Sequence, residues 1–241
     1  MIVHHRIKES IYSLTKNYTQ LLGSTWLTAL SKNLLKSQYM NNLQHYIDET
    51  YKKSDFVYPR NQIDIFKPFK LTKATEIRVV IFGNEPAPGP TSNGLAFGAY
   101  RSATPGNQEL NSLKCSRDIK NCLDPDNLKD FKDFDCTLLT WAEQQVLLLN
   151  ISPISEYGNV MKHEYIFRNF IREVVKEIDS SSSEVVFVFT SQNQYKHFEK
   201  YIDRNFHTVL QYDGIDPDSS IFEDINRVLD ENSIDRTPIE W

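Results

Sequence analysis

The sequence predicts an α/β protein with a central, mostly parallel four-stranded sheet flanked by helices. Short runs of consecutive apolar residues alternate with segments of helical periodicity, as expected when strands are buried on both faces and covered by amphipathic helices. With 241 residues, 40% of them hydrophobic, the chain can bury the core of one large domain. We therefore expect a single domain over 1–241, with a helical N-terminal part, 1–53, and an α/β core, 54–241.

The N-terminal part is predicted to be helical because its apolar residues recur at spacings of three and four positions. This periodicity predicts one helix over 10–22 and a second over 26–53, which no proline or glycine interrupts. The segment 57–72 that follows contains Pro59 and Pro68, so an irregular connection is expected there.

The core segments alternate between strands and helices. Apolar runs predict strands over 77–83, 146–150, 184–190 and 207–212. Helical patterns predict helices over 109–123, 138–145, 163–179 and 194–203, and an acidic helix near the C-terminus. In open parallel sheets, ligands bind at the carboxyl ends of the strands. The turns that follow the first three strands read GNEPAPG, NISPI and TSQNQ, and we expect the functional site there.

The charge pattern limits the possible partners. The net charge is −5, and the segment 213–235 carries eight acidic residues against a single arginine, Arg227. A protein that binds nucleic acid through its phosphates usually presents a basic face. Any such face must therefore be local, and the acidic segment is not expected to contact a phosphate backbone.

Cofactors and membranes are not expected. The three cysteines show no ligand spacing, which argues against a disulfide framework and against zinc. No apolar run approaches the length of a membrane span, and the first residues lack the apolar core of a signal peptide. These observations predict a cytoplasmic protein that uses no metal or cofactor, and we further expect a monomer.

Several motifs occur in an order that resembles one enzyme family. They are VYP followed by IFKPF, VVIFGNEP, GPTSNGLAFG, LLTWAEQQVLLLN, VVFVFTSQNQ, VLQ and the terminal PIEW. From about Trp26 to the last residue, the chain looks like a family 1 uracil-DNA glycosylase. The resemblance implies that family's fold and its reaction, in which a base is flipped out of DNA into a pocket and its glycosidic bond is hydrolysed.

The resemblance assigns base-binding residues. Phe97 matches the aromatic residue that stacks on the base, and Asn150 matches the amide that reads the polar edge of uracil. Asn84 lies in the same turn as the catalytic carboxylate and belongs to this group. Ala87 stands where the family has the tyrosine that excludes the methyl group of thymine. A core phenylalanine and a strand-end cap remain the alternative interpretations of Phe97 and Asn150.

The catalytic motifs differ from those of the family. Glu85 replaces the aspartate that positions the attacking water and is one methylene longer; a displacement of about 1 Å can reduce a rate on the order of a hundredfold. The family's loop His-Pro-Ser-Pro-Leu-Ser aligns with residues 214–219 of this chain, which contain no histidine. Asp216 is the nearest polar substitute, and losing a preorganised donor costs roughly 3 to 4 kcal/mol. Asp218 replaces the leucine wedge, which offsets the few kcal/mol that base extrusion costs.

Two further positions are candidates for nucleic-acid binding. Ser191 keeps the serine of the family's Gly-Ser loop, although Thr190 replaces the glycine that lets the backbone approach a phosphate. Gln108 stands roughly at the serine of the family's proline-rich loop.

Two functions follow from these differences. The first is a pseudoenzyme with the glycosylase fold, which lacks ordinary uracil excision and is retained for binding a nucleic acid, a base or a protein. The alternative is an active DNA glycosylase for thymine or a 5-modified uracil, in which Glu85 activates water. The candidate partners are DNA, bound weakly and as a single strand, and a glycosylase inhibitor or replication protein; no membrane partner is expected.

Overall fold

The computed structural model describes residues 18–101, 109–126, 128–180, 183–232 and 237–241. Its centre is a four-stranded sheet in the order β3-β2-β5-β6, with all neighbouring strands parallel. The strands are β2 (Val79–Gly83), β3 (Val146–Asn150), β5 (Val186–Phe189) and β6 (Thr208–Gln211). Every residue of β2, β3 and β5 is buried, which explains their continuous apolar sequences. The predicted fold class is confirmed.

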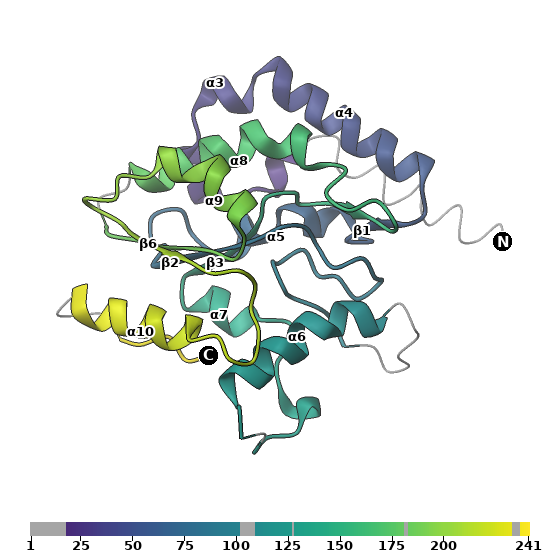
Figure 1. The fold of residues 1–241 in the computed structure, drawn as a ribbon. Coiled ribbons are helices and arrows are strands. Elements are labelled where there is room, and N and C mark those ends of the chain that lie inside the picture. Colours follow the sequence, from purple (N-terminus) through teal and green to yellow (C-terminus); the bar gives the residue numbers. More distant parts are fainter. Residues whose placement is uncertain (1–17, 102–108, 127, 181–182, 233–236) are drawn as a thin grey trace.

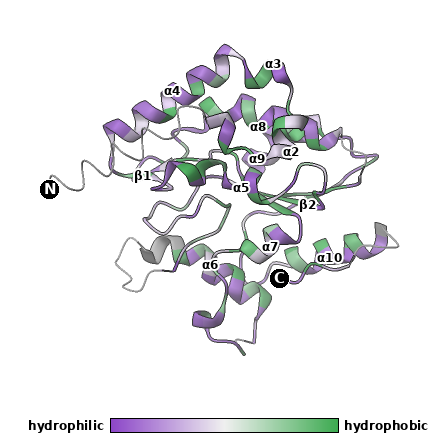
Figure 2. Ribbon diagram, turned by 180° about the vertical axis from the view of Figure 1, so that it is seen from behind, coloured by the Kyte–Doolittle hydropathy of each residue, from purple (hydrophilic) through white to green (hydrophobic). Residues whose placement is uncertain are grey.

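Helices cover both faces of this sheet (Figure 1). One layer holds α4 (Gln38–Lys53), α8 (Glu164–Asp179) and α9 (Gln192–Phe198), and the other holds α6 (Glu109–Leu123), α7 (Leu139–Glu143) and α10 (Ile221–Asn232). Figure 2 shows the same two layers from behind, with the sheet between them. Alternate residues of β2 face opposite layers: Val80 and Phe82 belong to the apolar cluster of the first layer, and Val79 and Ile81 to that of the second.

The predicted helix over 26–53 is wrong as a single element. The structure has three helices there, α2 (Ser24–Ala29), α3 (Lys32–Leu35) and α4. The hydroxyls of Ser31 and Ser37 accept hydrogen bonds from the backbone N–H groups of Leu34 and Met40, so each serine starts a new helix. Of the predicted helix over 10–22, residues 10–17 lie outside the described residues, and Tyr18–Leu21 form the 3₁₀ helix η1.

The segment 57–72 is more regular than predicted. It contains β1 (Val57–Tyr58), the 3₁₀ helix η2 (Gln62–Phe66) and α5 (Lys67–Leu71). Strand β1 pairs antiparallel with β4 (Ser155–Glu156), a small sheet that the sequence did not predict. Pro68 fits the first turn of α5, where a missing N–H does no harm.

The remaining elements are short. The 3₁₀ helix η3 (Phe131–Asp133) follows α6, and η4 (Glu199–Tyr201) extends α9, so together α9 and η4 form most of the predicted helix over 194–203. Within the part of the chain that the structure describes, no helix is long and apolar enough to cross a membrane.

Candidate active site at the carboxyl edge of the sheet

The turns after β2 and β3 lie side by side because the two strands are paired in register. Gly83 pairs with Asn150 at the last position of the two strands. Beyond it, the N–H of Ile151 donates to the carbonyl of Gly83 at 2.9 Å, and the N–H of Ser152 donates to the carbonyl of Asn84 at 2.9 Å. Strand β5 pairs with β2 on its other side, and Ser191 and Gln194 of the turn after β5 bond to Asn84, so the structure brings all three predicted turns together at the expected edge of the sheet.

Asn150 is buried with its side-chain amide unsatisfied. The residue is 2% exposed, and neither Oδ1 nor Nδ2 has a hydrogen-bond partner among the described residues. A Cβ at Gly83 would lie 2.5 Å from Asn150 Oδ1, so the amide needs a glycine at this place. A buried amide without partners destabilises a fold by about 1–3 kcal/mol. Buried polar groups without a hydrogen bond are rare in folded proteins. A ligand that supplies a hydrogen bond to each end of the amide would explain this one.

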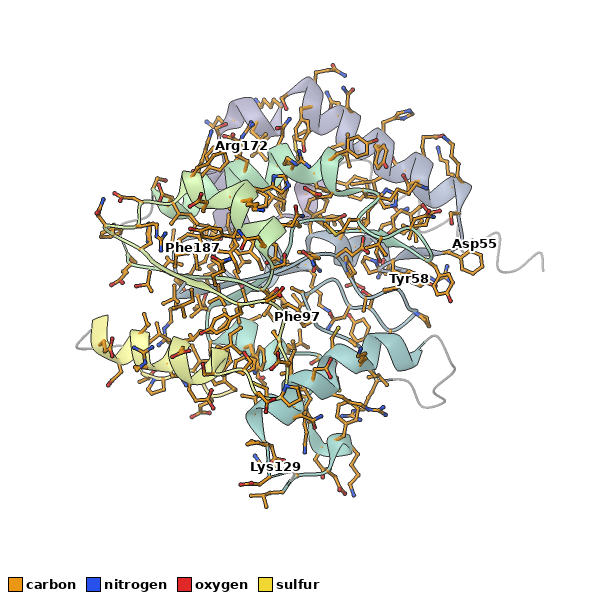
Figure 3. All side chains as sticks on the ribbon, in the orientation of Figure 1. Asp55, Tyr58, Phe97, Lys129, Arg172 and Phe187 are labelled. Atoms are coloured by element: carbon orange, nitrogen blue, oxygen red, sulfur yellow. The ribbon has the colours of Figure 1, made fainter. Side chains whose placement is uncertain are left out.

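Phe97 has a strained backbone. Its φ is +64°, which is rare for a bulky side chain and is found where surrounding structure enforces it. The neighbouring N–H of Ala96 donates to the carbonyl of Leu148 on β3 at 3.2 Å, which fixes this segment to the sheet. Phe97 is only partly buried against the apolar cluster of the second layer, and its label lies near the centre of Figure 3. Stacking of Phe97 on a base stays a prediction, with a core phenylalanine as the alternative.

Glu85 is a half-buried carboxylate held from the opposite loop. Its Oε2 accepts a hydrogen bond of 2.9 Å from the backbone N–H of Met161. Burial raises the pKa of Glu85 to about 7, although the bond from Met161 lowers it. A pKa near 7 suits a group that gives and takes protons at neutral pH. Whether Glu85 holds a water stays a prediction.

Asn84 and Ala87 lie on either side of Glu85 in the turn. The Oδ1 atom of Asn84 accepts hydrogen bonds from Gln194 Nε2, at 2.9 Å, and from Ser191 Oγ, at 3.2 Å. The Asn84 side chain is therefore engaged with the N-terminus of α9. Ala87 is partly exposed. The base-binding roles of both residues stay predictions.

The polar groups that follow β5 are hydrogen-bonded to other groups of the protein. Thr190 Oγ1 donates to the carbonyl of Phe82 at 2.7 Å, and Ser191 is the N-cap of α9 in a capping box with Gln194. Gln194 is fully buried, and its Oε1 accepts from the N–H groups of Thr190 and Ser191 at 2.8 and 3.1 Å. The Ser191 hydroxyl thus has a structural role in the described site, and binding of a phosphate by it stays a prediction.

The loop after β6 carries no donor side chain at the position of the family's histidine. That position is Gly214, with a φ of +99°, and its N–H donates to the carbonyl of Thr190 at 2.9 Å. Asp216 and Asp218 are both exposed, and Asp216 Oδ1 accepts a hydrogen bond of 3.1 Å from the N–H of Asp218. This carboxylate caps its own turn, and its catalytic role stays a prediction.

Two residues of this site were not predicted. The sequence S-x-x-Q from Ser191 to Gln194 is a capping-box signature and could have identified Gln194. Met161 has no such signal, since it contributes only its backbone N–H. Gln108 lies outside the described residues. Among the described residues, no group of three or more His, Cys, Asp or Glu could hold a metal ion.

The fold and the site define an α/β protein with a candidate ligand site at the carboxyl edge of a parallel sheet. No family model matches the sequence. The uracil-DNA glycosylase of Aeromonas hydrophila is 30% identical over 200 residues, covering 77% of this chain and 83% of that protein. That of Photorhabdus laumondii is 29% identical over 229 residues, covering 90% and 95%. That of Streptococcus pyogenes is 28% identical over 220 residues, covering 87% and 94%. The chain belongs to the uracil-DNA glycosylase family.

Solved structures show the same fold. The mimivirus uracil-DNA glycosylase superposes with a TM-score of 0.76 at 18% identity, covering 93% of this chain and 89% of that one. The glycosylase from Nitratifractor salsuginis gives a TM-score of 0.53 at 15% identity, covering 86% and 88%. At these identities the likeness concerns the fold alone.

Proposed function

We propose that this protein binds a uracil-type base between Phe97 and Asn150, and that it excises ordinary uracil slowly compared with its relatives. The observation that carries the proposal is the buried Asn150 amide, whose donor and acceptor both lack a partner among the described residues. Uracil presents an N–H and a carbonyl side by side, which such an amide pairs with simultaneously. The partly open ring of Phe97 supplies a stacking surface.

Slow excision follows from the loop after β6. Negative charge develops on the departing base, and a preorganised donor near it is worth about a hundredfold to a thousandfold in rate. The corresponding position is Gly214, and the polar side chains beside it in the loop, Asp213 and Asp216, are exposed carboxylates. An ionised carboxylate repels a developing anion. Base binding with slow excision of ordinary uracil is the function that this loop supports.

A second candidate is excision of a base with a substituent at C5, such as thymine or 5-hydroxymethyluracil. Two observations favour it. Ala87 leaves room at the position of the family's tyrosine, and the raised pKa of Glu85, about 7, suits proton transfer at neutral pH. This reaction uses the same pocket and requires Glu85 to position a water.

An excision assay separates the two candidates. Single- and double-stranded oligonucleotides that carry uracil, a thymine mispair or 5-hydroxymethyluracil are incubated with the protein and then cleaved with alkali at abasic sites. The first candidate predicts uracil cleavage at least about a hundredfold slower than by a family member with the histidine loop. Cleavage of a 5-substituted base that disappears in Glu85→Gln supports the second candidate. Uracil cleavage at the rate of that family member contradicts the first.

Protein partners are the remaining possibility from the sequence. A variant of the mimivirus uracil-DNA glycosylase has been solved in complex with the inhibitor UGI, and its fold matches this chain with a TM-score of 0.76. An inhibitor that binds the family's leucine wedge would contact Asp218 in this chain, which is an exposed acidic residue. We therefore expect weak inhibitor binding, which a pull-down with an immobilised inhibitor measures.

A further inference from the structure

An exposed apolar surface borders the candidate site on the side of the β1–β4 sheet. It consists of Phe56, Tyr157 and Val160, which are 51%, 49% and 83% exposed. The register pairs Val57 with Glu156, and the N–H of Tyr157 donates to the carbonyl of Phe56 at 3.0 Å. Phe56 and Tyr157 therefore stand opposite each other, and opposite residues of an antiparallel pair project from the same face. We call these three residues the rim patch.

The rim patch is continuous with the catalytic turn. Tyr157 lies in a turn that is closed by a hydrogen bond from the N–H of Asn159 to the carbonyl of Glu156. Val160 directly follows this turn and precedes Met161 in the chain. The Met161 N–H is the group that holds Glu85. A nucleic-acid strand whose base reached the pocket would therefore pass close to these side chains. Asp55, the neighbour of Phe56, is labelled at the outer edge of the molecule in Figure 3, on the solvent side.

The chemistry of the rim patch fits nucleobases. Exposed aromatic rings stack on bases of any sequence, and each stacked base strengthens binding about tenfold or more. Arg60 lies nearby with its guanidinium 4.8 Å from the centroid of the Tyr58 ring, and it is exposed. Because Arg60 is exposed, its guanidinium can contact a phosphate of the same strand. Aromatic and cationic groups together are typical of single-strand grooves.

The loop after β6 favours single-stranded over duplex DNA as the ligand. Extruding a base from a duplex costs free energy that an inserted apolar side chain normally offsets. In this chain the wedge position is Asp218, which is exposed and acidic. Bases of a single strand are already free to leave their neighbours and to stack on protein rings.

We propose that the rim patch is a stacking platform for single-stranded DNA, which holds the bases next to the one in the Phe97–Asn150 pocket. This inference deepens the proposed function and rests on it for the position of the strand. It assigns the substrate class as unpaired DNA. A protein docked on the same apolar surface is the competing occupant, and it predicts no effect of the patch on DNA affinity.

The test measures binding of a fluorescent oligodeoxyadenylate at low salt by anisotropy, as a single strand and after annealing. Adenine also presents a donor beside an acceptor, so Asn150→Leu is titrated in parallel and reports how much of the binding comes from the pocket. We expect tighter binding of the single strand, and a loss of about tenfold or more in Phe56→Ala/Tyr157→Ala. Tyr157→Phe keeps a ring and should bind within about twofold of the unaltered protein. Phe206→Ala removes a 44% exposed ring before β6, at the opposite edge of the sheet, and is the matched control.

The outcomes separate the platform from the proposed function. Unchanged affinity in the double variant, equal binding of duplex and single strand, or no binding at all overturns the platform. Free uracil is titrated in parallel. If uracil fails to bind while the single strand binds and responds to the double variant, the base-binding function falls and the platform stands. Thermal unfolding of each variant checks that the exposed substitutions leave the fold intact.

Discussion

The two halves of the carboxyl edge of the sheet differ in whether their polar side chains have hydrogen-bond partners within the protein. In the β2–β3 half, the amide of Asn150 is buried without a partner among the described residues. The carboxylate of Glu85 accepts one hydrogen bond, from a backbone N–H, and burial raises its pKa to about 7. In the β5–β6 half, Thr190, Ser191 and Gln194 bond to one another and to neighbouring turns. One half holds polar groups ready for a ligand, whereas the other uses them to hold the fold together.

This difference has opposite consequences for stability in the two halves. An unsatisfied buried amide destabilises the fold, so a chain freed from ligand binding gains stability by replacing it. A network that satisfies its own groups stabilises the fold whether or not a ligand binds. We propose that the edge consists of a base-reading half, at β2 and β3, and a structural half, at β5 and β6, and each half can be tested by itself.

The largest effect is expected in the structural half. Gln194→Leu leaves the N–H groups of Thr190 and Ser191 and the Oδ1 of Asn84 without their buried partner. We expect the free energy of unfolding to fall by about 3 kcal/mol, since each unmade buried bond costs about 1–3 kcal/mol and water reaches some of these groups. Urea denaturation measures it. The matched control is Gln192→Leu on the exposed start of α9, which should change stability by less than about 1 kcal/mol.

An effect of opposite sign is expected in the base-reading half. Asn150→Leu replaces the unsatisfied amide with an apolar group of similar shape, which removes a buried polar group that has no partner among the described residues. The free energy of unfolding should rise by about 1–2 kcal/mol. Urea denaturation in the absence of ligand measures this change. A fall of similar size would show that the amide has a stabilising partner, and the distinction between the halves would fail.

A smaller effect is expected for the loop after β6. Asp216→Asn/Asp218→Asn keeps the Oδ1 that accepts the turn hydrogen bond and removes two exposed negative charges. We expect DNA affinity at low salt to rise by about threefold to tenfold, and the gain to shrink at high salt because the charges are screened. Anisotropy titrations at two salt concentrations measure it. Asp230→Asn/Glu231→Gln, on the exposed end of α10, carries the same charge change and should have less effect.

The last effect depends on pH. The pKa of Glu85 is raised by burial from 4.5 to about 7, so the folded protein binds more protons than the unfolded chain between these values. The contribution of this group to stability therefore falls as pH rises through that window. Glu85→Gln cannot ionise and should be more stable than the unaltered protein at pH 8, with the difference absent at pH 4. Thermal unfolding at both pH values measures it, and an equal difference at both would contradict the raised pKa.

The sequence was sufficient to predict the sheet because buried parallel strands leave a local signature, as in VVIFG and VLLLN. It also predicted that Asn150 and the turn of Glu85 meet, since both follow paired strands. The breaks in the N-terminal helix were missed, because serines inside an amphipathic pattern can be helical or can cap. The contact of Met161 with Glu85 was missed because a backbone donor leaves no trace in the side-chain sequence.

The most direct test of the base-reading half is a calorimetric titration of free uracil into the protein and into Asn150→Leu. We predict saturable binding to the unaltered protein and binding about thirtyfold weaker in the variant, since two hydrogen bonds worth about 1 kcal/mol each are lost. Asp216→Asn should bind uracil as the unaltered protein does. Absence of uracil binding, or equal affinity of the unaltered protein and Asn150→Leu, would contradict a base-reading role for the β2–β3 half.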